Sequence, residues 1–151
     1  MHIVYHCATG CHSSSTAAAM HLDLLPIDTK PSYHDLINVP FYDELEETDR
    51  GRLILRGTDI KGNKIYTLSR KYIPHLVLPV VCDTWKAFNQ SEKDLMLINT
   101  QPGVNGFMKF GGYLSRRLKL TKVGKPIVAK ATLYSYNYIA NIVKDTKDLL
   151  S

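Results

Sequence analysis

The sequence predicts an α/β fold: a three-layer sandwich with a mostly parallel sheet, P-loop-like or Rossmann-like, plus an antiparallel β-hairpin. Three observations predict this class. Short apolar strand patterns alternate with helical patterns, which favours a parallel sheet covered by helices. A loop of small residues joins the first strand to a helix start. A turn-rich segment over 57–63 separates two further strand patterns, which adds the antiparallel pair.

The element boundaries follow from apolar periodicity and from capping and turn residues. Ser13 begins a helix that we expect to end at Pro26, and Ser32 with Asp35 forms a capping box for a short helix that stops near Pro40. Gly111 and Gly112 lie within a helical pattern, and such a pair usually permits a close backbone approach or a kink. The expected strands are 2–6, 52–56, 64–68, 94–99 and 127–131, and the remaining helices are 72–88, 104–118 and 135–149.

Length and composition indicate a soluble globular protein. The 151 residues carry a net charge of +5, and 44% of them are hydrophobic, so we expect one domain over residues 1–151. No window is apolar enough for a membrane span, and the N-terminus lacks the features of a signal peptide. Three cysteines, an odd number, suggest reduced thiols. We therefore expect a cytoplasmic protein without a membrane partner.

The loop after the first strand is the strongest functional signal. Residues 6–15 are mostly small or polar, and they lead into a helix whose first amides and partial positive charge favour anions. In an open α/β sheet this loop lies at the ligand-binding edge. The segment therefore predicts a cradle for phosphate or carboxylate. Its expected ligand-binding residues are Thr9, Gly10, Cys11, Ser13, Ser14 and Ser15.

Three interpretations of this loop are possible: a nucleotide-binding loop, a cysteine nucleophile and a metal site. A Walker-type nucleotide loop is poorly supported, because its lysine position falls on His12 and its glycine positions fall on His6 and Cys11. Cys7 is a candidate nucleophile, since a helix N-terminus lowers the pKa of a thiol, and His12 is a candidate acid–base residue.

The third interpretation is a metal site. His6, Cys7, Cys11 and His12 offer zinc-type donors, but all four lie within seven residues. Cys82 or His75 would have to complete such a site, so no metal ligand is assigned and the cofactor stays unknown.

The basic C-terminal half supplies further candidates. Arg116 and Arg117 lie near the end of the predicted helix 104–118, which follows a predicted buried strand, and either guanidinium is able to bind a phosphate through two hydrogen bonds. A solvated basic helix end is the alternative interpretation.

The spacing Cys7-x-x-Gly10-x-x-Ser13-Ser14 resembles the phosphocysteine loop of sugar-phosphotransferase-system IIB subunits. It is also similar to the loop of low-molecular-weight phosphatases, except that Ser13 stands where their closing arginine stands.

The chain as a whole resembles a family of about 150 residues from spore-forming Gram-positive bacteria, known only as a domain of unknown function. The resemblance rests on several short motifs and implies a small cytoplasmic bacterial protein without an established activity. These motifs include Gly10 with His12-Ser13-Ser14, Gly57-Thr58-Asp59, Gly111-Gly112-Tyr113-Leu114-Ser115-Arg116-Arg117 and Gly124-Lys125-Pro126.

The sequence thus predicts binding of a phosphorylated small molecule or nucleotide, with phosphoryl transfer or hydrolysis as the reaction class if the protein is an enzyme. The alternative is a non-catalytic protein- or RNA-interaction module that uses the basic C-terminal half, with nucleic acid the less favoured ligand. The oligomeric state stays open. Gly10→Val is expected to abolish anion binding with little unfolding.

Overall fold

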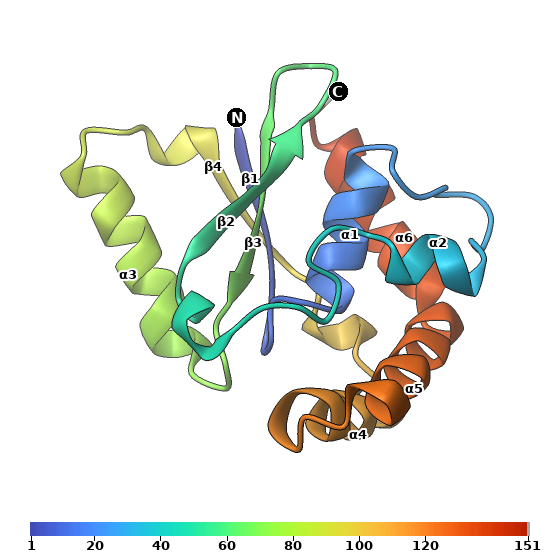
Figure 1. Cartoon of the computed structure of the whole chain (residues 1–151). Helices are drawn as coiled ribbons and strands as arrows, with labels where there is room; N and C mark the ends of the chain where they lie inside the picture. Colours follow the sequence, from blue (N-terminus) through green and yellow to red (C-terminus); the bar gives the residue numbers. More distant parts are fainter. Residues whose placement is uncertain (151) are drawn as a thin grey trace.

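A four-stranded mixed sheet organises the chain, and a computed structural model describes residues 1–150 (Figure 1). The strand order is β2-β3-β1-β4, with β1 parallel to both β3 and β4 and with β2 antiparallel to β3. The strands are β1 (His2–Cys7), β2 (Leu53–Thr58), β3 (Lys64–Ser69) and β4 (Leu95–Asn99). The α/β class, the mostly parallel sheet and the hairpin are therefore confirmed.

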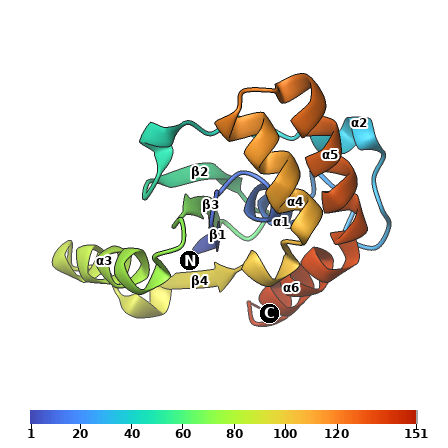
Figure 2. The same ribbon diagram turned by 90° about the horizontal axis from the view of Figure 1, so that it is seen from below.

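Six α-helices accompany the sheet within residues 1–150 (Figure 2). They are α1 (Ser13–His21), α2 (Tyr33–Ile37), α3 (Pro74–Ala87), α4 (Gly106–Gly112), α5 (Thr121–Tyr134) and α6 (Tyr136–Asp148). A π-helical turn, η4 (Tyr113–Arg117), continues α4. Three short 3-10 helices are η1 (Glu47–Asp49), η2 (Glu92–Asp94) and η3 (Gln101–Gly103). None of the described helices is long and apolar enough to cross a membrane.

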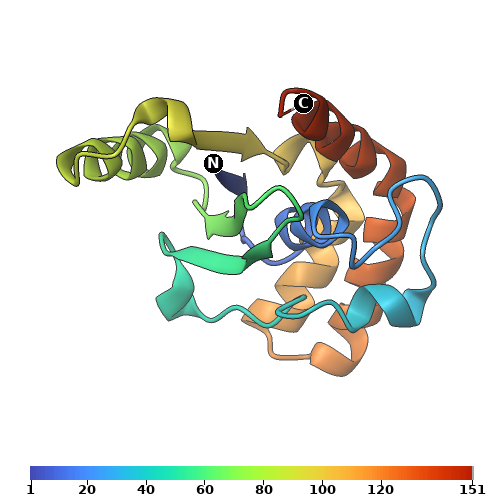
Figure 3. The same ribbon diagram turned by 90° about the horizontal axis from the view of Figure 1, so that it is seen from above.

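The two faces of the sheet are covered differently (Figure 3). Alternate residues of β1 point to opposite faces, and Ile3 and Tyr5 enter the core formed with α1 and α6. On the other face, the ring of His2 lies 4.7 Å from that of Trp85 in α3. The main core therefore lies between the sheet and the helices on the α1 side.

The predicted strand at 127–131 is wrong, because these residues belong to helix α5. A run as short as Ile127 to Ala131 has no periodicity that separates a strand from a buried helix. Pro126, which usually breaks a helix, lies inside α5. The predicted end of the first helix is also too late, since α1 ends at His21 rather than at Pro26.

Close backbone approaches bring α5 against α4 and η4. A Cβ on Gly124 would overlap the backbone nitrogen of Ser115, and one on Gly111 would lie 2.8 Å from the backbone nitrogen of Val128. A Cβ on Gly112 would lie 3.1 Å from Cε1 of His12. The expectation of a close backbone approach is confirmed at Gly111, whereas Gly112 leaves room for the His12 ring. The same backbone constraint explains the glycine in Gly124-Lys125-Pro126.

The Gly124 contact gives a stability prediction. Gly124→Ala should lower the free energy of unfolding by about 2 kcal/mol or more, because backbone must shift to admit the methyl group. Gly106→Ala is the matched control, since a Cβ there meets nothing within 4 Å. Urea denaturation of both variants measures the difference, and equal stabilities would contradict the tight crossing.

Candidate functional site

A cavity of about 740 Å³ opens at the carboxyl ends of the three parallel strands. Its walls include Ala8 and Thr9 after β1, Ser69 and Lys71 near the end of β3, and Gln101 after β4. The chain passes from β1 to β3 on the α1 side of the sheet and from β3 to β4 on the α3 side (Figure 3). Open α/β sheets bind ligands at this kind of position, and the volume suits a small molecule.

Cys7 lines this cavity, and its sulfur lies among hydrogen-bond donors. The Gly10 amide donates to Sγ over 3.1 Å, and the Ser14 hydroxyl lies 3.3 Å away. Burial on its own raises the pKa of the Cys7 thiol, but hydrogen bonds from Ser14, Ser13 and Gly10 outweigh it and lower the pKa below its ordinary value. The loop thus favours a thiolate.

Gly10 allows the loop to fold back over Cys7. Its φ is +74°, and a Cβ would lie 2.8 Å from the backbone nitrogen of Ser69. The turn is fixed further by the Ser69 hydroxyl, which donates to the Ala8 carbonyl, and by Ser15, which donates to the Gly10 carbonyl. The expectation that Gly10→Val causes little unfolding is therefore wrong, because the valine side chain would collide with backbone.

The serines after the loop face inward. The Ser13 hydroxyl pairs with that of Thr100 at 3.1 Å, and the Ser15 hydroxyl accepts from Arg56 at 3.2 Å. Ser13, Ser14 and Ser15 are buried, and none of them lines the cavity, whereas Thr9, Cys11 and His12 do. A ligand in the cavity would meet the loop backbone and Thr9 rather than the three serine hydroxyls.

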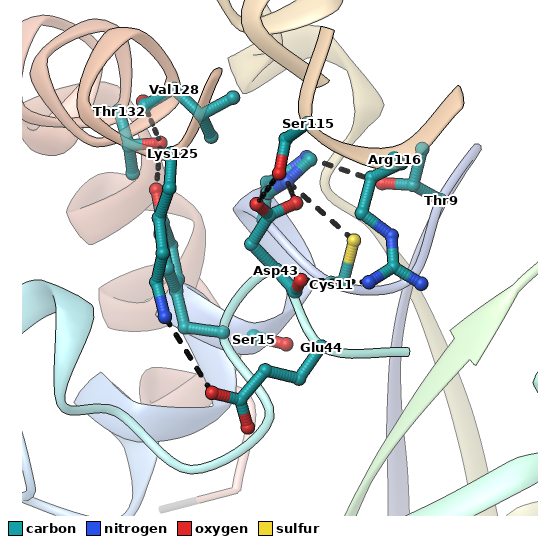
Figure 4. A network of polar contacts seen from close by, with 12 residues as sticks. Thr9, Cys11, Ser15, Asp43, Glu44, Ser115, Arg116, Lys125, Val128 and Thr132 are labelled. Atoms are coloured by element: carbon teal, nitrogen blue, oxygen red, sulfur yellow. Dashed lines mark hydrogen bonds and ion pairs between the residues drawn. The ribbon is translucent and has the colours of Figure 1, made fainter. Parts of the chain in front are cut away.

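A buried polar network joins the loop to two distant segments (Figure 4). His12 Nε2 lies 2.8 Å from Asp43 Oδ1, and His12 Nδ1 lies 3.4 Å from the Thr9 hydroxyl. The Ser115 hydroxyl donates to the other carboxylate oxygen of Asp43, and Arg116 donates to its main-chain carbonyl over 2.8 Å. The network therefore fixes one wall of the cavity.

This network changes the charge state of its members. Burial lowers the pKa of His12, but the neighbouring Cys11 and Asp43 outweigh it and raise the pKa well above its usual range. Burial raises the pKa of Asp43, whereas His12 and Ser115 hold it below its usual range. A charged His12 and a charged Asp43 therefore stabilise each other in the interior.

The cavity mouth is cationic. Arg116 and Arg117, either of which the sequence offered as a phosphate ligand, both line the cavity. Lining residues with positive charge outnumber those with negative charge by six to two. The cations are Arg50, Lys71, Lys109, Arg116, Arg117 and Lys119, and the acids are Glu46 and Glu47. Such an excess raises the local concentration of anions.

Comparison with known proteins identifies the family. The model of the DUF3189 family, described as a protein of unknown function, matches residues 2–148. The chain belongs to this family. The resemblance found from the sequence motifs is thereby confirmed. No curated protein and no solved structure compared with the chain matches it.

Two interactions of this DUF3189 chain have no signal in the local sequence. Asp43 was only one acid in a charged segment, and no local pattern indicates that it lies buried beside a histidine 31 residues earlier. No sequence motif contains Arg70. Its guanidinium nevertheless donates to Nδ1 of His6 over 3.0 Å and to Oδ1 of Asn99 over 3.2 Å. Arg70 thus ties together the carboxyl ends of β1, β3 and β4.

The structure separates the residues that the sequence offered as metal ligands. His6 pairs with Arg70, Cys7 faces Ser14, and Cys82 lies on α3. Cys11 and His12 instead lie beside Asp43, and their potential ligand atoms all lie within 4.8 Å of one another. Among residues 1–150, this trio is the one group of three or more metal-type donors at that spacing.

A second buried chain of hydrogen bonds fixes the other end of α1. Tyr5 Oη lies 2.7 Å from His21 Nδ1, and His21 Nε2 lies 3.2 Å from Asp59 Oδ2. Asp59 also accepts from the amides of Lys61 and Asn63 in the hairpin turn. Asp59, considered as a turn residue from the sequence, therefore ties the hairpin to α1.

The pKa of His6 predicts a pH dependence of stability. Burial and Arg70 lower the pKa of His6 from 6.5 to about 4 in the folded protein. The unfolded chain therefore binds the proton more tightly than the folded protein. As the pH falls from about 6.5 to about 4, protonation of His6 in the unfolded chain lowers the free energy of unfolding. His6→Asn keeps an acceptor for Arg70 without titrating. Its free energy of unfolding should fall less over this range, by on the order of 2 kcal/mol.

Urea denaturation at several pH values measures this difference between wild type and His6→Asn. Parallel pH profiles for the two proteins would contradict a lowered His6 pKa.

The hydrogen bonds on Cys7 predict a second titration. Ser14→Ala removes a donor to the sulfur, so the pKa of Cys7 should rise by about one unit. The ultraviolet absorbance of the thiolate during a pH titration reports this pKa, and Cys7→Ser identifies the transition that belongs to Cys7. Cys82→Ser is the control, since that thiol lies on α3. An unchanged Cys7 transition in Ser14→Ala would contradict the role of Ser14.

Proposed function

We propose that the cavity binds a phosphorylated small molecule or nucleotide and that Cys7 acts as the nucleophile in phosphoryl transfer or hydrolysis. One observation carries this proposal: a thiol with a lowered pKa lines a cavity whose mouth is cationic. The wrapping of the loop around the sulfur supports the likeness to phosphocysteine loops noted in the sequence. The finer fold class, a three-layer P-loop-like or Rossmann-like sandwich, belongs to the same proposal and rests on α1 and α3 lying on opposite faces (Figure 3).

Phosphate binding would use the loop backbone and the cations of the mouth. The first amides of α1 have no acceptors within the helix, and they carry its partial positive charge. Arg116 is already held by the Asp43 carbonyl at the cavity wall, so its guanidinium needs little ordering to meet an anion. Arg117 and Lys71 add charge from two other segments.

The chemical step follows from this arrangement. The Cys7 thiolate attacks phosphorus, a sulfur–phosphorus bond forms, and the bond from phosphorus to the leaving oxygen breaks with its electron pair on that oxygen. The leaving oxygen takes a proton from water. A second water, or another acceptor hydroxyl, then takes the phosphoryl group and restores the thiolate. The cations stabilise the charge on the phosphoryl oxygens during both steps.

We assign His12 a positioning role in this reaction. Its Nε2 faces Asp43 and its Nδ1 faces the Thr9 hydroxyl, which in turn lies 3.8 Å from the Cys7 sulfur. His12 thus holds Thr9 at the cavity wall beside the nucleophile.

Ligand-dependent stability tests the proposal. Inorganic phosphate, sugar phosphates and nucleotides should be screened for a rise in the melting temperature, because a ligand that binds only the folded state stabilises it by mass action. Arg116→Ala should reduce the rise, since it removes a cation from the mouth. Lys144→Ala is the matched control, because Lys144 pairs with Asp28 and does not line the cavity.

A chemical test isolates the nucleophile. After reaction with a phosphate ester that has a good leaving group, mass spectrometry at neutral pH should find one phosphoryl group on the wild type and on Cys82→Ser, and none on Cys7→Ser. Failure of every phosphorylated compound to bind or react would overturn the proposed function.

The interaction module is the second candidate, and one observation favours it. α4 and η4 carry one lysine and two arginines. They also carry three exposed aromatic side chains, which are Phe107, Phe110 and Tyr113. Aromatic rings and cations together suit single-stranded nucleic acid or a protein surface. Adding single-stranded RNA to the screen at several salt concentrations separates the candidates, because binding to RNA would weaken steeply with salt and would not depend on Cys7.

A further inference from the structure

Three different metal-type donors converge at one point of the cavity wall. Cys11 Sγ lies 3.6 Å from His12 Nε2, and His12 Nε2 lies 2.8 Å from Asp43 Oδ1. All three residues are buried, with relative exposures of 1%, 4% and 5%. The donors come from two segments far apart in the sequence, so the tertiary fold creates the cluster.

We propose that Cys11, His12 and Asp43 bind a single divalent transition-metal ion, with zinc as the preferred ion, and leave one coordination position open to the cavity. This site shares the cavity with the proposed phosphate cradle, of which Cys11 is an expected member, but it does not rest on the proposed function. Cys7 takes no part in it, because its sulfur faces Gly10 and Ser14.

The spacing of Cys11 and His12 fits a tetrahedral ion, and the spacing of His12 and Asp43 needs a small adjustment. With zinc–sulfur and zinc–nitrogen bonds of about 2.3 and 2.0 Å, tetrahedral geometry separates sulfur from nitrogen by about 3.5 Å. The observed 3.6 Å between Cys11 and His12 agrees with this value. A nitrogen and an oxygen ligand would lie about 3.3 Å apart, so the His12–Asp43 contact of 2.8 Å must lengthen by about 0.5 Å.

The donor set selects the class of metal. A sulfur, an imidazole nitrogen and a carboxylate oxygen together suit zinc and similar transition metals, whereas calcium and magnesium require oxygen ligands. Structural zinc sites have four protein ligands, while catalytic zinc sites have three and keep a position for water or substrate. Cys11 and His12 both line the cavity, so the fourth position would face its interior.

Neighbouring groups already orient the three ligands. The amide of Asp43 donates to the Cys11 carbonyl over 3.1 Å, which fixes these two residues relative to each other. The second carboxylate oxygen of Asp43 accepts from Ser115. Metal binding would release to solvent the proton that charged His12 shares with Asp43 through Nε2. With Nε2 on the ion, the remaining nitrogen of His12 faces the Thr9 hydroxyl at 3.4 Å. Partners of this kind are typical of metal sites.

Cobalt titration tests this site directly. The wild-type protein, freed of metal with a chelator, should bind one equivalent of Co²⁺ and develop the thiolate-to-cobalt charge-transfer band together with visible bands of tetrahedral cobalt. Zn²⁺ should then displace the cobalt. Absence of the charge-transfer band in the wild type would overturn the proposal without any variant.

Variants assign the ligands. Cys11→Ser should lose the charge-transfer band, and Asp43→Asn should bind Co²⁺ more weakly by about tenfold or more. Ser115→Ala, which leaves all three ligands in place, should weaken binding by about tenfold through the lost support of Asp43. Circular dichroism confirms that each variant is folded.

Cys7→Ser and Cys82→Ser are the matched thiol controls and should keep the band. A band that survives in Cys11→Ser but disappears in Cys7→Ser would overturn the assignment. Because Cys7→Ser removes the nucleophile while sparing the metal ligands, failure of the phosphoryl chemistry and failure of the metal site give different results.

Discussion

The carboxylate of Asp43 is the constraint on which the architecture of the cavity depends. A buried charge is costly unless hydrogen bonds and an opposite charge surround it. Asp43 satisfies this requirement through His12 on one side and Ser115 on the other, so three segments of the chain must meet there. The residues on either side of Asp43 are also anchored to α5 (Figure 4). The Tyr42 hydroxyl is hydrogen-bonded to the Thr132 hydroxyl over 2.7 Å, and Glu44 forms an ion pair with Lys125.

The π-helical turn η4 belongs to the same constraint. Widened helical turns of this kind are frequent at functional sites because they redirect side chains. Here the turn presents Ser115 and Arg116 to Asp43, and Gly124 of α5 leaves the room that the backbone at Ser115 needs. Packing between α4, η4 and α5 therefore determines where one wall of the cavity stands and which cations line it.

The sequence predicted the parts of the fold that depend on local patterns. The strand–loop–helix start, the capping box at Ser32 and Asp35, the hairpin and the C-terminal helix all have such patterns. Residues 127–131 have no such pattern. A short apolar run after a proline, such as the one after Pro126, is compatible with a strand and with a buried helix. At the site, local chemistry pointed to Cys7, His12 and the loop between them. Asp43 and Arg70 were missed because their importance comes only from residues that tertiary folding brings to them.

The chain Tyr5–His21–Asp59 has a consequence for ligand binding. It fastens the C-terminal end of α1 to the sheet and the hairpin, while the His12–Asp43 pair fastens the N-terminal end. Because both ends of α1 are held, the helix cannot tilt and change the conformation of the loop that precedes it. The loop around Cys7 is therefore preorganised, and a ligand bound as proposed would lose little free energy to ordering the protein.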